Sequence, residues 1–370
     1  MNRHAIGLLL AAVVLVGTVP TGAAAAPTQT ASPTCEYPLT MTDATGTEVT
    51  VDQPPERVVV TGASGAQTMW EIGASGQVVG MPVKPWTTYL EGAEEKEEVT
   101  NQDGTLNVER TIAANPDLVL AANITSNDKV AQLRAADITV YTFALADSIP
   151  FIYEKTNTTA AMTGNCAAAE RVVSAMRANV SAVKERAEGG NSPSAFVHLG
   201  SGYTATVGSF QHDVLTTAGA TNVATELNTS AYGRVSRESV IEANPEFIVV
   251  PVANASVDPA AQLPDAYSNL TAVQEDQVVG VNTNYFSQPA PRVTRPLVAL
   301  SEAFYEGEVQ VESETELETG PNTTTMNMTE ESTTTAAGTS TTTASGGTPG
   351  FGPVVALAAL LAGLFATRRE

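Results

Sequence analysis

An internal repeat is the feature that most constrains the fold of this 370-residue chain. The segment Glu109–Leu120 aligns with the segment Glu238–Val249, and both contain Asn-Pro at the same place. Because proline disfavours the helical conformation of the residue before it, each copy predicts a short helix that ends at Asn-Pro. The apolar run that follows in each copy predicts a buried strand. A helix-strand unit that occurs twice predicts two similar α/β halves.

A second repeated order of elements supports this division. In the first half, Arg57–Thr61 predicts a strand, followed by a Gly/Ser loop and a helix at Gln67–Ile72 that ends at glycine. In the second half, Ala195–Leu199 predicts the strand, Gly200–Ser209 the loop and Asp213–Ala218 the helix. Strands that alternate with helices are typical of parallel α/β sheets. We therefore expect a βα rhythm in each half.

One long helix is predicted between the two halves, at Ala167–Glu188. Apolar residues recur there at helical spacing without internal glycine or proline, and Gly189-Gly190 ends the run. We expect this helix to join two α/β lobes. The predicted divisions are an N-terminal lobe at 35–150, a helical segment at 151–190 and a C-terminal lobe at 191–305.

Five segments carry a family resemblance in their order and spacing: Thr42–Val51, Pro55–Val60, Ala114–Leu120, Val235–Val250 and Gln288–Arg292. With them the chain resembles the helical-backbone class of solute-binding proteins of ABC importers for cobalamin and ferric chelates. The similarity runs from about Cys35 to Tyr305. It implies an α/β fold of two βα-sandwich lobes joined by one long α-helix, with the ligand cleft between the lobes. It also implies delivery of the ligand to an ABC permease and its ATPase.

A ligand in such a cleft would meet loops at the carboxyl ends of strands, where α/β sheets present binding groups. The loops that qualify by position are Ser64–Ala66, Lys84–Leu90, Gly200–Ser209, Asn228–Val235 and Asn284–Arg292. Their aromatic rings can stack on a flat ligand, and their arginines can pair with its anionic groups. The candidate ligand-binding residues are Trp86, Tyr89, Tyr203, Tyr232, Arg234, Tyr285, Phe286 and Arg292. For each of them, packing or a solvated surface role is the alternative.

Two other groups of side chains have separate interpretations. The resemblance implies that an acidic residue on the first helix of each lobe docks onto arginines of the permease. Asp213 stands at this position in the second lobe, whereas neutral Gln67 departs from the pattern in the first lobe. Glu71, one turn further along, is a possible substitute. Trp70, in the middle of the predicted helix beside Met69, is interpreted as a core residue.

The start of the chain predicts export. Residues 1–26 place Arg3 and His4 before a short apolar run and a stretch of small residues, which is the layout of a signal peptide. Only Cys35 and Cys166 occur in the chain, and the oxidising exterior predicts a disulfide between them, with two buried free thiols as the alternative.

The end of the chain predicts attachment at the cell surface. Residues 306–348 are rich in Glu and then in Thr and Ser, a composition that cannot bury a core and predicts a glycosylated stalk. In residues 349–370, Pro349, Gly350 and Phe351 precede a short apolar tail and an arginine pair, as in the PGF-CTERM surface proteins of archaea, which this tail resembles. The resemblance implies that an archaeosortase removes the tail and that the new end is attached to a membrane lipid. Asn-x-Ser/Thr triplets along the chain predict a cell-surface glycoprotein.

Charge and motifs exclude several functions. A net charge of −22 argues against binding to nucleic acid, because it repels phosphate. The same charge favours solubility at high salt and suggests a halophilic source. An ordinary acidic secreted protein is the alternative. After residue 26 only His198 and His212 remain, and no zinc, nucleotide or hydrolase motif occurs, so we expect no enzyme activity, metal site or permanently bound cofactor. The ligand, cobalamin or a ferric chelate, would arrive already chelated and bind a monomer. Haem, an oxyanion, or a non-transport adhesive role on the same fold are the alternatives.

Overall fold

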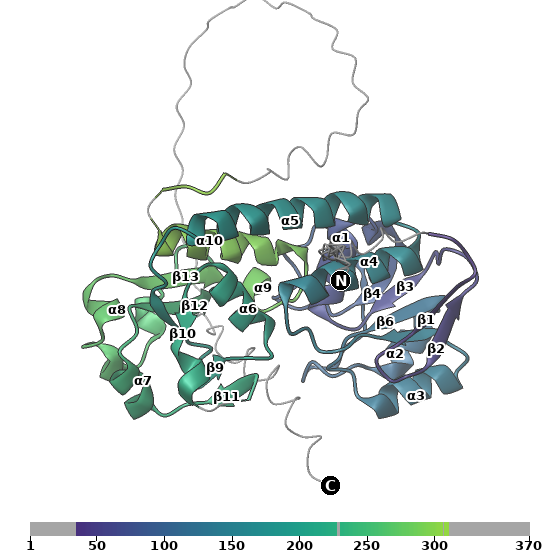
Figure 1. Cartoon of the computed structure of the whole chain (residues 1–370). Helices are drawn as coiled ribbons and strands as arrows, with labels where there is room; N and C mark the ends of the chain where they lie inside the picture. The colour runs from purple at the N-terminus through teal and green to yellow at the C-terminus, as the bar shows by residue number, and fades with distance from the viewer. Residues whose placement is uncertain (1–34, 228–229, 306, 311–370) are drawn as a thin grey trace, which may run out of the picture. The chain divides into compact units, whose positions relative to one another are not determined.

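The computed structural model describes residues 35–227, 230–305 and 307–310 (Figure 1). The predicted signal peptide, most of the predicted stalk and the tail with Pro349, Gly350 and Phe351 lie outside the described residues. In the described part, no helix has both the length and the apolar character needed to cross a membrane.

The first sheet is parallel, with strand order β5-β4-β3-β6-β7. Its strands are β3 (Val58–Val60), β4 (Val78–Met81), β5 (Glu97–Glu98), β6 (Leu118–Ala121) and β7 (Val140–Thr142). Parallel strands need crossover connections, and the crossovers here carry α1 (Ala63–Glu71), α2 (Val108–Ala113) and α3 (Asn127–Ala135). Every residue of β3 is fully buried, as expected for a central strand with covering layers on both faces.

The second sheet is also parallel, with strand order β10-β8-β12-β13. Its strands are β8 (Ser194–Val197), β10 (Thr221–Asn222), β12 (Phe247–Val252) and β13 (Val278–Asn282). Its helices are α6 (Phe210–Thr217), α7 (Arg237–Ala243), α8 (Thr271–Gln274) and α9 (Thr283–Phe286). We call the parts built around the two sheets the first lobe and the second lobe.

Two antiparallel pairs accompany the sheets. β1 (Leu39–Thr42) pairs with β2 (Glu48–Val51), and β9 (Tyr203–Ala205) pairs with β11 (Tyr232–Arg234). The second pair differs from the prediction, which treated both of its strands as loops. Short 3-10 helices are η1 (Ser75–Gln77), η2 (Ala93–Glu95), η3 (Val223–Leu227), η4 (Ala260–Gln262), η5 (Asp265–Tyr267) and η6 (Pro291–Val293).

The predicted repeat is confirmed in detail. α2 leads into β6 and α7 leads into β12, and the asparagines between them, Asn115 and Asn244, both adopt left-handed backbone with φ of 47° and 41°. The acidic residue that follows proline holds the start of the neighbouring strand in both lobes. Asp117 accepts from the Arg57 N–H at 2.9 Å, and Glu246 accepts from the Ser194 N–H at 2.7 Å. The sequence repeat is thus a repeat of hydrogen bonds as well as of elements.

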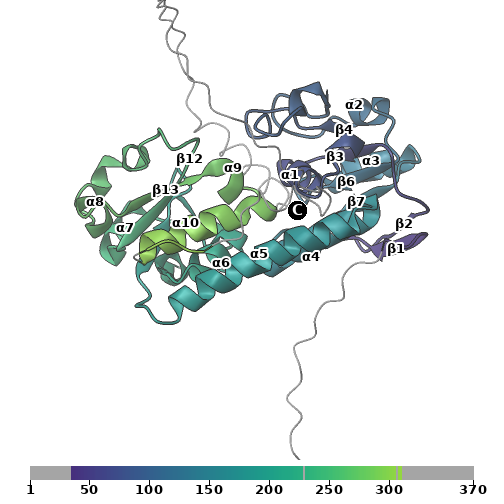
Figure 2. The same cartoon turned by 90° about the horizontal axis from the view of Figure 1, so that it is seen from above.

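A pair of helices belongs to the cores of both lobes. α5 (Cys166–Ala187), the predicted long helix, packs against α4 (Ile149–Thr163) and against α10 (Thr294–Phe304), as Figures 1 and 2 show. Ile152 of α4 lies in the core cluster of the second lobe, whereas Met162 of the same helix lies in that of the first lobe. The two cores therefore meet along this helix pair.

The disulfide prediction is confirmed, and the alternative of two free thiols is wrong. Cys35 and Cys166 are bonded, with 5.9 Å between their Cα atoms, and neither cysteine is free. The bridge joins the segment before β1 to the first residue of α5.

Helix α1 differs from its prediction in two respects. It begins at Ala63, four residues earlier than the predicted start at Gln67. Trp70 is only partly buried, and its Nε1 donates to the Glu91 carbonyl at 2.9 Å. Its assignment as a core residue is therefore wrong in part: the ring packs against the first-lobe core without being enclosed by it.

Candidate functional site

A small pocket, open to solvent, lies at the carboxyl ends of β3, β6 and β7. Among its lining residues are Gly62, Ser64, Asn123, Phe143, Lys155 and Pro289. Ser64 belongs to α1, Lys155 to α4, and Pro289 to the second-lobe segment before η6, so both halves of the chain contribute. The carboxyl edge of a parallel sheet is where ligands are expected, because loops and helix N-termini converge there.

Lys155 is the one titratable residue of the pocket lining. It is 6% exposed, and its ammonium donates to the Ser64 Oγ at 2.8 Å and to the Pro289 carbonyl at 2.9 Å. Burial lowers the pKa of Lys155 to about 7, because removal of water disfavours the charged form. Among the described residues no carboxylate forms an ion pair with it.

Large apolar side chains are exposed beside the pocket. Ile124 and Leu145, with exposed fractions of 45% and 41%, follow β6 and β7 in the chain. Each is next in sequence to a lining residue, Asn123 or Ala144. Contiguous exposed apolar groups around a concavity are a mark of binding sites. We call Ile124 and Leu145, which neighbour lining residues in sequence, the apolar rim.

A second group of predicted residues forms a hydrogen-bonded network between the lobes. The Gln67 side-chain amide donates to the Tyr89 hydroxyl at 2.7 Å and to Gln288 Oε1 at 3.3 Å. Its carbonyl oxygen accepts from the Arg292 N–H at 3.1 Å, and Gln288 in turn donates to the Trp86 carbonyl at 2.8 Å. We call these five residues the interlobe network.

Charge and aromatic rings extend this network. The Arg292 guanidinium donates to Glu71 Oε1 at 2.6 Å and lies 5.5 Å from the Tyr89 ring centre and 5.8 Å from that of Tyr285. Burial raises the pKa of Tyr89 to about 12, although the Gln67 hydrogen bond and nearby Arg292 act in the opposite direction. Tyr89, Tyr285 and Arg292 thus lie together, and their polar side-chain groups already bind protein. Trp86 joins them through its backbone carbonyl. Their role in ligand binding stays a prediction.

The other predicted residues lie on the antiparallel pair of the second lobe. The Tyr232 hydroxyl, whose pKa is raised by burial, donates to Gln211 Oε1 at 2.6 Å. Arg234 is exposed, lies 5.4 Å from the Tyr203 ring centre and donates to the Ser201 carbonyl. Only the exposed face of this pair is accessible to a ligand.

The predicted roles of Phe286 and of two docking residues need correction. Phe286 is fully buried in the second-lobe core, because α9 turns its ring inward, so it is not a ligand contact in this structure. Gln67 is also fully buried and cannot reach a permease, and Glu71 is held by Arg292. Asp213 accepts from the Ile149 N–H at 2.7 Å and so holds the first turn of α4. Of the three, only Asp213 remains a docking proposal.

Lys155 was not identified from the sequence as a residue of the pocket. The loops Ser64–Ala66 and Asn284–Arg292 were expected at the site and do contribute, but Lys155 was not singled out. Two signals were available: Lys155 is one of only five lysines in the chain, and Asn123 is the first polar residue after the strand of the first repeat. No group of three or more His, Cys, Asp or Glu side chains placed to hold a metal ion occurs among the described residues.

The interlobe network predicts a large effect for Gln67→Glu. The new carboxylate would face Gln288 Oε1 and the Asn284 carbonyl, which are both acceptors, and we expect a loss of about 2–3 kcal/mol in the free energy of unfolding at pH 7. Because the pKa of the buried carboxyl would be raised, the loss should shrink as the pH falls toward about 4. Guanidinium unfolding would measure it, with Gln132→Glu on the exposed face of α3 as control. Equal losses for the two variants would contradict the network's role.

Comparisons with known proteins agree with this architecture. A family model described as periplasmic binding protein matches residues 58–285, and the PGF-CTERM motif matches residues 348–369, which confirms the predicted sorting tail. That motif indicates a secreted protein held at the cell surface. A cobalamin-binding protein of Halobacterium salinarum is 39% identical over 310 residues, which cover 80% of this chain and 84% of that protein.

Two solved structures share the fold. The periplasmic vitamin B12-binding protein BtuF of Vibrio cholerae has a TM-score of 0.59 at 21% identity, with 68% of this chain and 97% of that chain covered. An ABC-type Fe3+-hydroxamate transport protein from Saccharomonospora viridis has a TM-score of 0.58 at 27% identity, with 73% and 99% covered. The family model spans most of both lobes, and the resemblance inferred from the sequence is confirmed. The chain belongs to the periplasmic binding protein family.

Proposed function

We propose that this protein captures cobalamin outside the cell and delivers it to an ABC permease and its ATPase. The observation that carries the proposal is the 39% identity, over most of both chains, to a protein named for cobalamin binding. The proposal contains no catalytic step.

The pocket supports a ligand of this kind. A corrinoid presents a broad, partly apolar ring system together with polar side groups. The apolar rim at Ile124 and Leu145 could contact the apolar ring system. Lys155 and Asn123 in the pocket lining could bind the polar side groups. On the second lobe, Tyr203 and Arg234 offer a stacking face and a cation.

The location of the protein at the cell surface is part of the proposal. The PGF-CTERM motif supports removal of residues beyond the stalk by an archaeosortase and attachment of the new end to a membrane lipid. With an export signal at residues 1–26, this would place the binding lobes outside the membrane, within reach of a permease, as a tethered monomer. Asp213 is the proposed docking residue.

Calorimetric titration of the purified full chain with cyanocobalamin in molar salt tests the function. We expect saturable binding of one ligand per protein, and at least tenfold weaker binding by Leu145→Asp, because a carboxylate on the apolar rim must be desolvated. Ile112→Asp is the matched control, since Ile112 is equally exposed at 41% but lies on α2, whereas Leu145 stands between the lining residues Ala144 and Ala146.

Three outcomes would contradict the proposal. Binding of a ferric hydroxamate in place of cobalamin would favour the iron-chelate function, which the 27% identity to the Saccharomonospora protein supports as the second candidate. Absence of binding to either ligand by a folded protein would favour the adhesive alternative. Normal cobalamin uptake in cells that lack the protein would exclude delivery as its role.

A further inference from the structure

The pocket contains a buried cation without an opposite charge. Lys155 is 6% exposed, and its two hydrogen-bond partners, the Ser64 hydroxyl and the Pro289 carbonyl, are neutral. A buried ammonium is unfavourable unless an anion or a set of hydrogen bonds compensates for the lost water. An ammonium has three donors, and two of them are used here, while Nζ also lies 5.9 Å from the centre of the Phe143 ring. The third donor has no oxygen or nitrogen acceptor among the described residues and could serve a ligand.

The N-terminus of α1 opens onto the same pocket. Its N-cap, Gly62, has no capping side chain, and its carbonyl accepts from the Gly65 and Ala66 N–H groups. This leaves the N–H groups of Ala63 and Ser64 without a partner in the helix. Gly62, Ser64 and Gly65 all line the pocket. Uncapped N–H groups at a helix start and the helix dipole both favour a bound anion. A Cβ at Gly62 would lie 2.8 Å from that of Ala122, so glycine is needed where α1 approaches the end of β6.

The remaining lining leaves space for a compact group. Ala122, Ala144 and Ala146 contribute small side chains, and no acidic residue lines the pocket. We propose that Lys155 and the N-terminal N–H groups of α1 together bind an oxyanion group of the transported ligand, a phosphate or a carboxylate. This inference rests on the proposed function and deepens it, since it states which part of the ligand enters the pocket.

Ligands that carry either a phosphate or a carboxylate distinguish which of the two groups binds in the pocket. Cobalamin carries one phosphodiester in its nucleotide loop, which cobinamide lacks. Haem and ferric citrate carry carboxylates instead. The phosphate assignment therefore predicts a preference for cobalamin over cobinamide that depends on Lys155, and the carboxylate assignment predicts a Lys155-dependent affinity for haem or ferric citrate.

The decisive experiment compares the full chain with its Lys155→Met variant, which keeps most of the apolar stem and removes the charge. We expect wild type to bind cyanocobalamin at least tenfold more tightly than dicyanocobinamide, and we expect Lys155→Met to lose at least tenfold of that ratio. Lys155→Gln is a second variant in case the first does not fold. A ratio unchanged by either variant, with haem and ferric citrate affinities also unchanged, would overturn the inference.

A second readout needs no organic ligand. Inorganic phosphate at millimolar concentration should raise the pKa of Lys155 in wild type, followed by NMR of the lysine side chain, because an anion favours the charged form. The elements packed against α4 carry several charged groups. Glu71 and Arg292 pair with each other, Asp213 accepts from the Ile149 N–H, and Arg177 lies over the Tyr153 ring. The remaining charged residues of α5 are Glu170, Arg171, Lys184, Glu185 and Arg186.

The two readouts separate the two proposals. A phosphate-induced rise without any corrinoid binding would refute the cobalamin function and support the oxyanion site. Corrinoid binding without a Lys155-dependent preference and without a phosphate-induced rise would support the function and refute the oxyanion site.

Discussion

Replacement of Cys35 and Cys166 together by serine is expected to lower the free energy of unfolding by about 5 kcal/mol. The bridge spans 131 residues, and its main effect in the chain-entropy account is to restrict the unfolded state. The closed loop contains the whole first sheet and α4, so the unfolded chain without the bridge gains much conformational freedom. Guanidinium unfolding of oxidised wild type and of the double variant would measure the difference.

The single variants are the control for this prediction. Either Cys35→Ser or Cys166→Ser removes the same covalent bond, so each should lose as much as the double variant. Reduction of the wild-type protein should produce the same loss. A double variant destabilised by less than about 1 kcal/mol would contradict the prediction, because the bridge would then add little to the constraint on the chain.

Local patterns predicted the elements of this fold because their causes are local. In each repeat copy, Asn-Pro ends a helix and an apolar run follows, and the structure has α2 before β6 and α7 before β12 at these positions. The long helix was predicted within one residue at each end, since continuous helical spacing and a glycine stop define it. The disulfide followed from compartment and cysteine number alone.

Nonlocal contacts account for what the sequence did not predict. β9 and β11 are three-residue strands that stabilise each other only as a pair, and neither has an alternating pattern of its own. Gln67 looks like a surface residue of an amphipathic helix, but α1 packs against second-lobe residues that are distant in sequence. The burial of Lys155 depends in the same way on α1 and Pro289, so no local pattern marks it.

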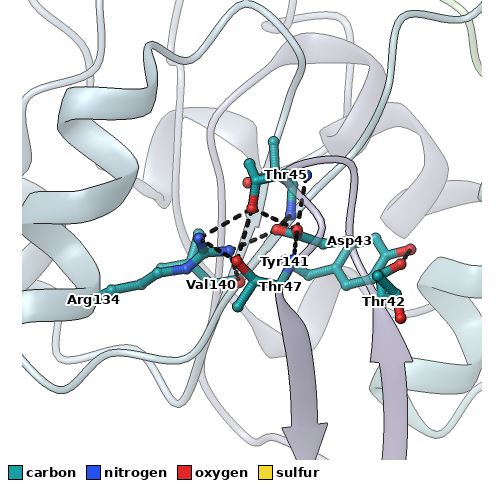
Figure 3. A network of polar contacts seen from close by, with 8 residues as sticks. Thr42, Asp43, Thr45, Thr47, Arg134, Val140 and Tyr141 are labelled. Atoms are coloured by element: carbon teal, nitrogen blue, oxygen red, sulfur yellow. Dashed lines mark hydrogen bonds and ion pairs between the residues drawn. The ribbon is translucent and has the colours of Figure 1, made fainter.

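Asp43→Ala should be the most destabilising single substitution of a polar residue, with an expected loss of about 3 kcal/mol in the free energy of unfolding. The Asp43 carboxylate is fully buried just after β1 (Figure 3). One oxygen accepts from the Thr45 N–H at 2.8 Å and from its hydroxyl at 2.6 Å, and the other from the Arg134 guanidinium at 2.6 Å and the Thr142 N–H at 3.0 Å. Removal would leave these donors without an acceptor.

The charge of Asp43 gives this loss a pH dependence. Burial disfavours the charged form, but hydrogen bonds from Thr45, Thr142 and Thr47 outweigh that effect and lower the pKa of Asp43 to about 2. Because the folded-state pKa lies below the unfolded value of 3.8, the stabilisation is complete above pH 4 and is lost as the pH falls toward 2. Asp43→Asn should therefore be destabilised at pH 7 by about 1–2 kcal/mol and by roughly half as much at pH 3.

Asp103→Asn is a matched control because Asp103 makes the same turn in an exposed position. It accepts from the Thr105 N–H at 3.0 Å and from the Thr105 hydroxyl at 2.7 Å, just as Asp43 accepts from Thr45, but no arginine is bonded to it. Chemical unfolding at pH 7 and pH 3 should show a smaller change for this variant than for Asp43→Asn. Equal changes would mean that the Asx turn alone stabilises the hairpin and that the Arg134 and Thr142 contacts, which join β1 and β2 to α3 and β7, contribute little.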